Sequence, residues 1–191
     1  MKVVIDTNSL LSLVRYYLPF DKNSVLHNFF KKQIEQGEII IIDKVLEECT
    51  YNSKGLVIET LAFLKDKKFL KSAKVPYKTD SMLAPSPAKF LRQVENQFVN
   101  TVVKRQRKLT ETEFESQKTS FLDNADIKQI ILCLNLLKNG EEVVLVTEET
   151  ESSNDNKLFK KIPSICKDLD IKTMTLPDLL SKFDGININV K

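Results

Sequence analysis

The stretch Met-Lys-Val-Val-Ile-Asp-Thr-Asn-Ser, residues 1–9, decides the fold of this chain. Its apolar, β-branched run ends at once on Asp6, which predicts a short buried strand with a carboxylate at its carboxyl end. In an open parallel sheet, ligands bind in the crevice beyond the carboxyl ends of the strands. Asp6 is therefore the first candidate functional residue, although an Asp before a helical pattern is also typical of an N-cap.

The rest of the chain alternates strands with helices. Further apolar runs predict strands at residues 39–42, 143–146 and 171–175. Helical spacing and end signals predict helices at residues 10–17, 24–36, 56–71 and 87–108. Four more helices are expected to begin at Thr110 with Glu113, after Asp126, at Pro163 and at Pro177. This order indicates βαβ units and a mostly parallel sheet. We expect one α/β domain over residues 1–191, with the first strand central and a helical insertion at about 54–120.

Composition excludes several classes of protein. No apolar run approaches the roughly 20 residues that a membrane span needs, and we expect no secretory signal, because Met1 and Lys2 lead directly into the first strand. The three cysteines are odd in number and widely spaced, so we expect reduced core thiols in a cytoplasmic protein.

Charge is distributed unevenly along the chain. Residues 54–108 hold 13 Lys and Arg against 4 Asp and Glu, and residues 109–159 hold 4 Lys and Arg against 11 Asp and Glu. Such blocks fit a polyanion-binding surface beside an acidic pocket, and they also fit two solvated helical faces.

Acidic residues follow the ends of several predicted elements. Asp6 ends the first strand, Glu47 and Glu48 follow the second, and Asp123 and Asp126 open a helix. Glu148 and Glu149 follow the strand at 143–146. In a parallel sheet these positions converge on one rim, where the carboxylates would repel each other unless a cation offsets their charge. Carboxylates with few or no His or Cys ligands select Mg²⁺ or Mn²⁺, which suits hydrolysis of a phosphodiester.

At these residues the chain resembles the PIN-domain ribonucleases, and more weakly an uncharacterised PIN-like subgroup. The matching pieces, in family order, are Val4-Ile5-Asp6-Thr7-Asn8, Val45-Leu46-Glu47-Glu48, Asn124-Ala125-Asp126 and Val146-Thr147-Glu148-Glu149. The resemblance implies a three-layer α/β/α fold and a Mg²⁺- or Mn²⁺-dependent endoribonuclease that hydrolyses single-stranded RNA. Such enzymes are often the toxin of a bacterial toxin–antitoxin pair, so an antitoxin protein and a second copy of the chain are expected partners.

Carried over by position, the resemblance assigns the catalytic and metal-binding roles to Asp6, Glu48, Asp126 and Glu149. Glu149 stands where the family more often has Asp, so Glu148 or Asp155 is an alternative fourth acid. The supporting polar groups would be Asn8, Ser9, Thr147 and Asp123. The residues themselves leave a simpler alternative for Asp123 and Asp126, namely a cap and third-position pair at the start of a helix.

A cationic cluster ends the helix predicted at 87–108. It consists of Lys104, Arg105, Arg107 and Lys108, which would contact RNA, or would simply complement the dipole at a helix end. The alternative for the whole protein is a catalytically inactive PIN-like module that binds RNA or protein. No membrane partner is expected.

Overall fold

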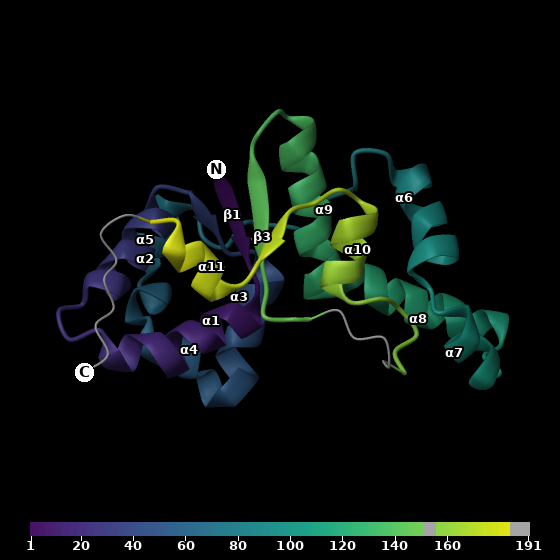
Figure 1. Ribbon diagram of the computed structural model, residues 1–191, viewed down its shortest axis with the longest axis horizontal. Helices are drawn as coiled ribbons and strands as arrows, with labels where there is room; N and C mark the ends of the chain where they lie inside the picture. Colours follow the sequence, from purple (N-terminus) through teal and green to yellow (C-terminus); the bar gives the residue numbers. More distant parts are fainter. Residues whose placement is uncertain (151–155, 184–191) are drawn as a thin grey trace.

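A computed structural model describes residues 1–150 and 156–183 (Figure 1). Its centre is a four-stranded sheet of β1 (Lys2–Ile5), β2 (Ile39–Ile40), β3 (Val143–Val146) and β4 (Thr173–Met174). The strand order is β2-β1-β3-β4 and all pairs are parallel, with Ile5 opposite Val146. The predicted parallel sheet with an interior first strand is thereby confirmed.

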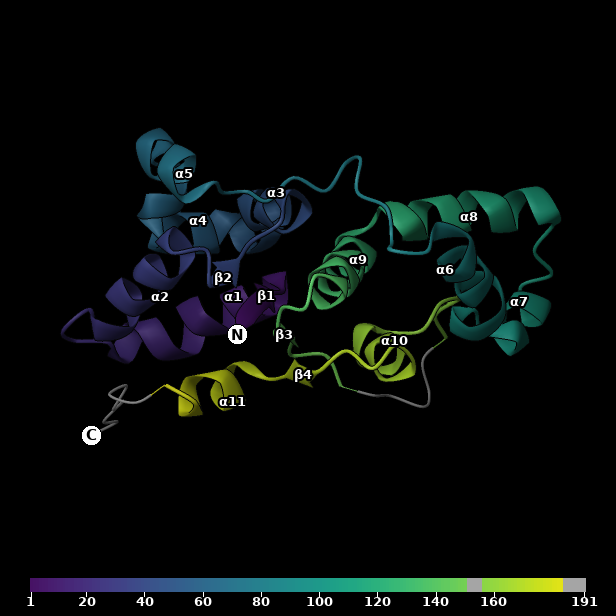
Figure 2. The ribbon, with the colours of Figure 1, turned by 90° about the horizontal axis from the view of Figure 1, so that it is seen from above.

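The sheet lies between two layers of helices, so the fold is a three-layer α/β/α arrangement. The helices are α1 (Thr7–Ser12), α2 (Val25–Glu35), α3 (Asp43–Tyr51), α4 (Leu56–Thr60), α5 (Lys67–Ala73), α6 (Pro87–Gln93), α7 (Thr101–Gln106), α8 (Glu111–Asp123), α9 (Ala125–Lys138), α10 (Ile162–Asp168) and α11 (Leu176–Ser181). Helices α1, α2 and α11 lie on one side of β1 and β3, and α9 and α10 lie on the other (Figures 1 and 2).

The helices of the predicted insertion fall into two separate groups. Helices α4 and α5 lie beside α2, whereas α6, α7 and α8 form a group beyond α9 at the opposite end of the molecule (Figure 2). The segment between α5 and α6 connects the two groups. Tyr77 of this segment donates its N–H to Ile41 O at 2.9 Å and accepts at its own carbonyl from Asp43 N at 3.0 Å. These bonds continue parallel backbone pairing just past the end of β2.

Three predicted elements are shorter than the sequence pattern indicated. The run 39–42 pairs with β1 only at Ile39–Ile40, because the next two residues turn toward the Tyr77 segment. The helix predicted at 56–71 breaks at Leu61 and restarts at Lys67, where Asp66 accepts from two backbone N–H groups. The last strand, predicted at 171–175, is reduced to Thr173–Met174.

The prediction of one long helix at 87–108 is also wrong, because the helix is interrupted before α7. Val99 leaves the helix to form an antiparallel bridge with Phe159, and Asn100 N donates to Leu158 O at 2.7 Å. Asn100 then caps α7 by accepting from Val103 N. Val102, in the first turn of α7, is 61% exposed.

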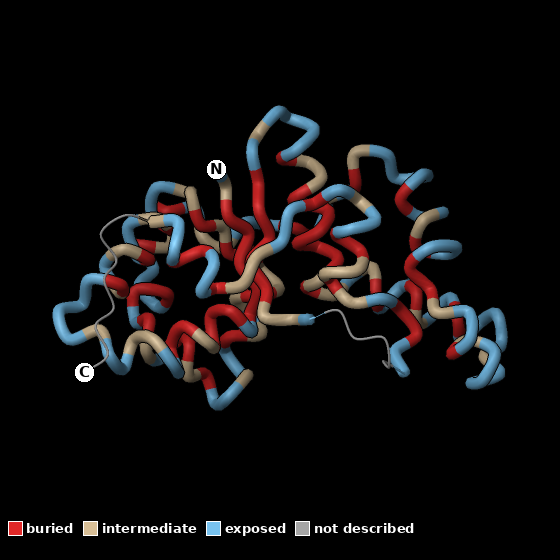
Figure 3. Tube along the Cα trace, viewed as in Figure 1, coloured by how far each residue is buried: buried red, intermediate tan, exposed pale blue. Residues whose placement is uncertain are grey.

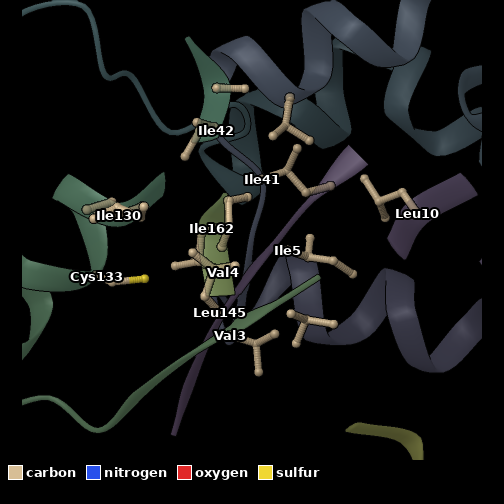
Figure 4. Packing of buried hydrophobic residues seen from close by; sticks show 14 of the residues in the cluster. Val3, Val4, Ile5, Leu10, Ile41, Ile42, Ile130, Cys133, Leu145 and Ile162 are labelled. Carbon is tan, nitrogen blue, oxygen red and sulfur yellow. The ribbon is translucent and has the colours of Figure 1, made fainter. Parts of the chain in front are cut away.

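The core surrounds the two central strands. Residues 3–5 of β1 and all of β3 are buried, as the red stretches of Figure 3 show. Val4 and Leu145 pack with Ile130 and Cys133 of α9 and Ile162 of α10 (Figure 4). All three cysteines are buried and free, as expected of core thiols. In the described part of the chain, no helix is both long and apolar enough to span a bilayer.

Candidate acidic site

Asp6 sits where β1 passes into α1, and it is almost completely buried. Its Oδ1 accepts from Thr7 N at 2.7 Å and from Gln129 Nε2 at 3.4 Å, and its Oδ2 accepts from Thr147 Oγ1 at 3.3 Å. Burial raises the pKa of Asp6 to about 6, against the lowering effect of the Gln129 and Thr7 hydrogen bonds. The charges of Glu48 and Glu149 are smaller contributions to this rise. Asp6 is thus both the helix N-cap and a member of an acidic group.

Glu48 reaches the same place from α3. The hydroxyl of Thr7, the first residue of α1, donates to Glu48 Oε2 at 2.5 Å. This bond links α1 to α3 directly beside Asp6. The neighbouring Glu47 is exposed, so of the two adjacent acids only Glu48 belongs to the site.

Asp126 occupies the first turn of α9. Its pKa is raised to about 7, with burial as the largest cause and the charges of Asp6, Glu149 and Glu48 as smaller ones. The cap of this helix is Asn124, whose Oδ1 accepts from Ile127 N at 2.9 Å. Asn124, and not Asp123, is therefore the cap, so the alternative of a cap and third-position pair is wrong.

Asp123 lies outside the acidic group. Its side chain is 61% exposed and pairs with Lys44 at 2.8 Å and with Lys128 at 3.7 Å. These ammonium groups, with the Lys44 hydrogen bond as the largest cause, hold the pKa of Asp123 below its usual value. Asp123 and Asp126, three residues apart in sequence, therefore have opposite electrostatic surroundings.

The structure separates the two adjacent acids after β3. Glu149 Oε2 accepts from Ile162 N at 3.2 Å, and its charge acts on Asp6 and Asp126. Glu148 Oε1 accepts instead from Leu176 N at 2.8 Å, at the start of α11. Glu149 is therefore the acid that faces the group, and Glu148 anchors α11. The third alternative, Asp155, lies outside the described residues.

Four of the predicted acids therefore converge from four parts of the chain. They are Asp6, Glu48, Asp126 and Glu149, which we call the acid cluster. Among the predicted supporting residues, Thr147 contacts Asp6, and buried Ser9 donates to Glu148 at 3.4 Å. Asn8 is exposed.

Two residues of the site were not predicted from the sequence. Gln129 is fully buried and its amide contacts Asp6. Lys157 Nζ lies 4.0 Å from Glu149 Oε1, and its charge lowers the pKa of Asp126 against the larger raising effects. A signal for Gln129 existed, since it follows Asp126 by one helical turn on an otherwise apolar stripe. Nothing in the spacing indicated Lys157.

The cationic cluster is partly engaged within the protein. Lys104 Nζ lies 3.4 Å from the ring centroid of Phe114, and Arg107 donates to the carbonyl oxygen of Asn156. Arg105 and Lys108 are exposed. Because Asn156 directly precedes Lys157, which reaches Glu149, a short stretch of backbone connects the cationic cluster to the acid cluster.

Comparison with known proteins gives a family without a known activity. The model of a family described as "Domain of unknown function (DUF4411)" matches residues 78–185, more than half of the chain, and the chain belongs to this family. The matched region includes Asp126, Glu149 and the cationic cluster, and it begins after Asp6 and Glu48. No curated protein and no solved structure matches the chain.

Proposed function

We propose that this member of the DUF4411 family is a metal-dependent endoribonuclease that hydrolyses phosphodiester bonds in single-stranded RNA. One observation carries the proposal: the acid cluster gathers four carboxylates, from four elements or their ends, at the carboxyl end of a parallel sheet. The raised pKa values of Asp6 and Asp126 reflect burial together with mutual repulsion. At neutral pH, a bound cation would offset the negative charge of the ionised carboxylates and so stabilise the acid cluster.

The chemistry of the acid cluster fits a hard divalent cation. All four side chains offer carboxylate oxygens, the ligands that Mg²⁺ and Mn²⁺ prefer, and none of the four is a soft ligand. As the side chains lie, no three His, Cys, Asp or Glu residues within 1–150 and 156–183 are grouped to hold one ion. Mg²⁺ keeps several waters and needs only one or two direct carboxylates, so a complete protein cage is not required.

Within this proposal, the chain's own residues hold and orient the acids. Asp6 and Asp126 would hold the cation, with Glu48 and Glu149 at its sides. Thr147 fixes the Asp6 carboxylate through its hydroxyl, and Thr7 fixes Asp6 through its N–H and Glu48 through its hydroxyl. A bound Mg²⁺ or Mn²⁺ would activate water for attack and neutralise charge on the phosphate.

RNA is the substrate class that the charge distribution supports. Arg105 and Lys108 are exposed at the end of α7, and the cationic cluster joins the acid cluster through residues 156–157. A strand whose backbone follows these cations would bring a phosphate toward the acids. A toxin–antitoxin role and a homodimer stay predictions.

The test is the cleavage of single-stranded RNA by the purified full chain. Chelation of divalent metal should stop cleavage, and Mg²⁺ or Mn²⁺ added back should restore it. RNA that binds but stays intact with either metal would contradict the enzymatic proposal and favour the inactive binding module.

A further inference from the structure

Gln129 is the unusual polar residue of the core. It lies in the middle of α9, its side chain is fully buried, and Asp6 Oδ1 accepts from its Nε2 at 3.4 Å. Within residues 1–150 and 156–183, its Oε1 is the one buried side-chain oxygen or nitrogen without a hydrogen-bond partner. A buried amide oxygen without a partner has lost the hydrogen bond that it makes with water in the unfolded chain. This loss destabilises the folded state unless a bound group donates a hydrogen bond to the oxygen.

The orientation of the amide follows from its neighbour. Turning the amide over would set two acceptors, Gln129 Oε1 and Asp6 Oδ1, against each other whenever Asp6 is ionised. The Nε2 group therefore remains on Asp6, and Oε1 stays available for a donor or a cation. The residues next to it along α9 are buried on several faces of the helix, as Ile127, Ile130 and Leu132 show.

The position of Gln129 indicates what would satisfy its oxygen. It follows Asp126 by three residues, so both side chains leave α9 on the same side, and its amide ends at Asp6. The free oxygen thus belongs to a side chain that contacts one acid of the cluster and neighbours another. A carboxamide oxygen is a hard acceptor suited to a divalent cation or to water polarised by one.

We propose that Gln129 is a positioning residue of the divalent-cation site: Nε2 orients Asp6, and Oε1 accepts a hydrogen bond from a water of the hydrated cation. This inference rests on the proposed function, because it requires a cation at the acid cluster. It adds to that site a neutral residue which neither the acid motifs nor the family match assigns.

The inference can be tested without RNA, by titrating the metal-free full chain with Mn²⁺ in a calorimeter. Gln129→Met keeps the length of the side chain and removes both polar groups. It should weaken Mn²⁺ binding roughly 10-fold, a typical effect of losing a group that orients metal ligands. Gln97→Met, at an exposed position, is the matched control and should bind as the wild type does.

A second variant keeps the test decisive if Gln129→Met does not fold. Gln129→Leu also removes both polar groups, has a similar size and favours the helical conformation of α9, so it should weaken Mn²⁺ binding by a similar factor. Unchanged binding by either folded variant would overturn the role of Gln129 and leave the metal site standing. If the wild type binds neither Mn²⁺ nor Mg²⁺, the proposed metal site fails and this inference fails with it.

Discussion

At the scale of single residues, the Asp6 carboxylate performs two tasks. It accepts from Thr7 N as the cap of α1, and it belongs to the acid cluster. From the sequence, capping and function were alternatives, but the geometry allows both, because an N-cap at the end of a parallel strand lies on the ligand-binding rim. Asp123 and Asp126 are close in sequence but differ in their surroundings. Lysine side chains lower the pKa of Asp123, whereas burial and other carboxylates raise the pKa of Asp126.

The raised pKa values predict how the stability of the metal-free protein depends on pH. Folded Asp6 and Asp126 have pKa values of about 6 and about 7 against an ordinary Asp value of 3.8, so the folded state holds these protons more tightly. This contribution is fully present below about pH 4 and is lost as the pH rises through about 7. The double variant Asp6→Asn/Asp126→Asn removes both titrations.

Urea unfolding in chelator at about pH 5.5 and at about pH 7.5 measures this effect. The wild type should lose about 2 kcal/mol more stability over this interval than the double variant does. An equal loss in both proteins would show that the pKa values of Asp6 and Asp126 are not raised in the folded protein.

At the scale of elements, the junctions after β3 hold the site together. Glu148 binds the start of α11 and Glu149 binds the start of α10, so two adjacent carboxylates secure two different helices. The charge of Glu149 raises the pKa values of both Asp6 and Asp126. The assignment of the fourth acid therefore follows from the direction in which each side chain leaves the strand.

A matched pair of substitutions tests this assignment. Glu149→Gln and Glu148→Gln each remove one charge and keep an oxygen for the backbone N–H that the carboxylate now accepts from. Metal-dependent cleavage should fall roughly 10- to 100-fold for Glu149→Gln and stay near wild type for Glu148→Gln. The reverse order of the two rates would assign the fourth position to Glu148.

The two central strands and the start of α8 could be predicted from the sequence, because local signals determine them. Continuous apolar runs mark β1 and β3, and Thr110 with Glu113 forms the expected capping box of α8. The break before α7 could not be predicted, since it depends on pairing of Val99 with Phe159, far away in sequence. Gln129 was missed because its role depends on a tertiary contact with Asp6.

At the scale of the whole molecule, the two ends of the helical insertion differ in their relation to the acid cluster. Helices α5 and α7 lie at opposite ends of the molecule in both views (Figures 1 and 2). Both carry exposed cations, but only the α7 end is linked to the acid cluster, through residues 156–157. If exposed cations bind RNA, the effect of removing them should therefore depend on where they lie in the molecule and not only on the change in net charge.

This difference supplies a control for RNA binding. Replacing Lys104, Arg105, Arg107 and Lys108 by Gln should weaken binding to single strands of any sequence and flatten the plot of log K against log salt. The slope should change by about 0.7 for each lost phosphate contact. The same replacement of Lys67, Lys68, Lys71 and Lys74, exposed cations in and just after α5, should leave the slope unchanged. Equal slopes for both quadruple variants would remove the cationic cluster from the RNA path.

The most direct test of the central claim compares two acids three residues apart. Single-stranded RNA is incubated with wild type, Asp126→Asn and Asp123→Asn, each with Mg²⁺ or Mn²⁺ and with chelator, and the rate of cleavage is measured. We predict metal-dependent cleavage by the wild type, none by Asp126→Asn, and nearly full activity for Asp123→Asn, whose carboxylate pairs with Lys44 outside the acid cluster. Cleavage that survives in Asp126→Asn, or that needs no metal in the wild type, would contradict the claim that the acid cluster is the catalytic site.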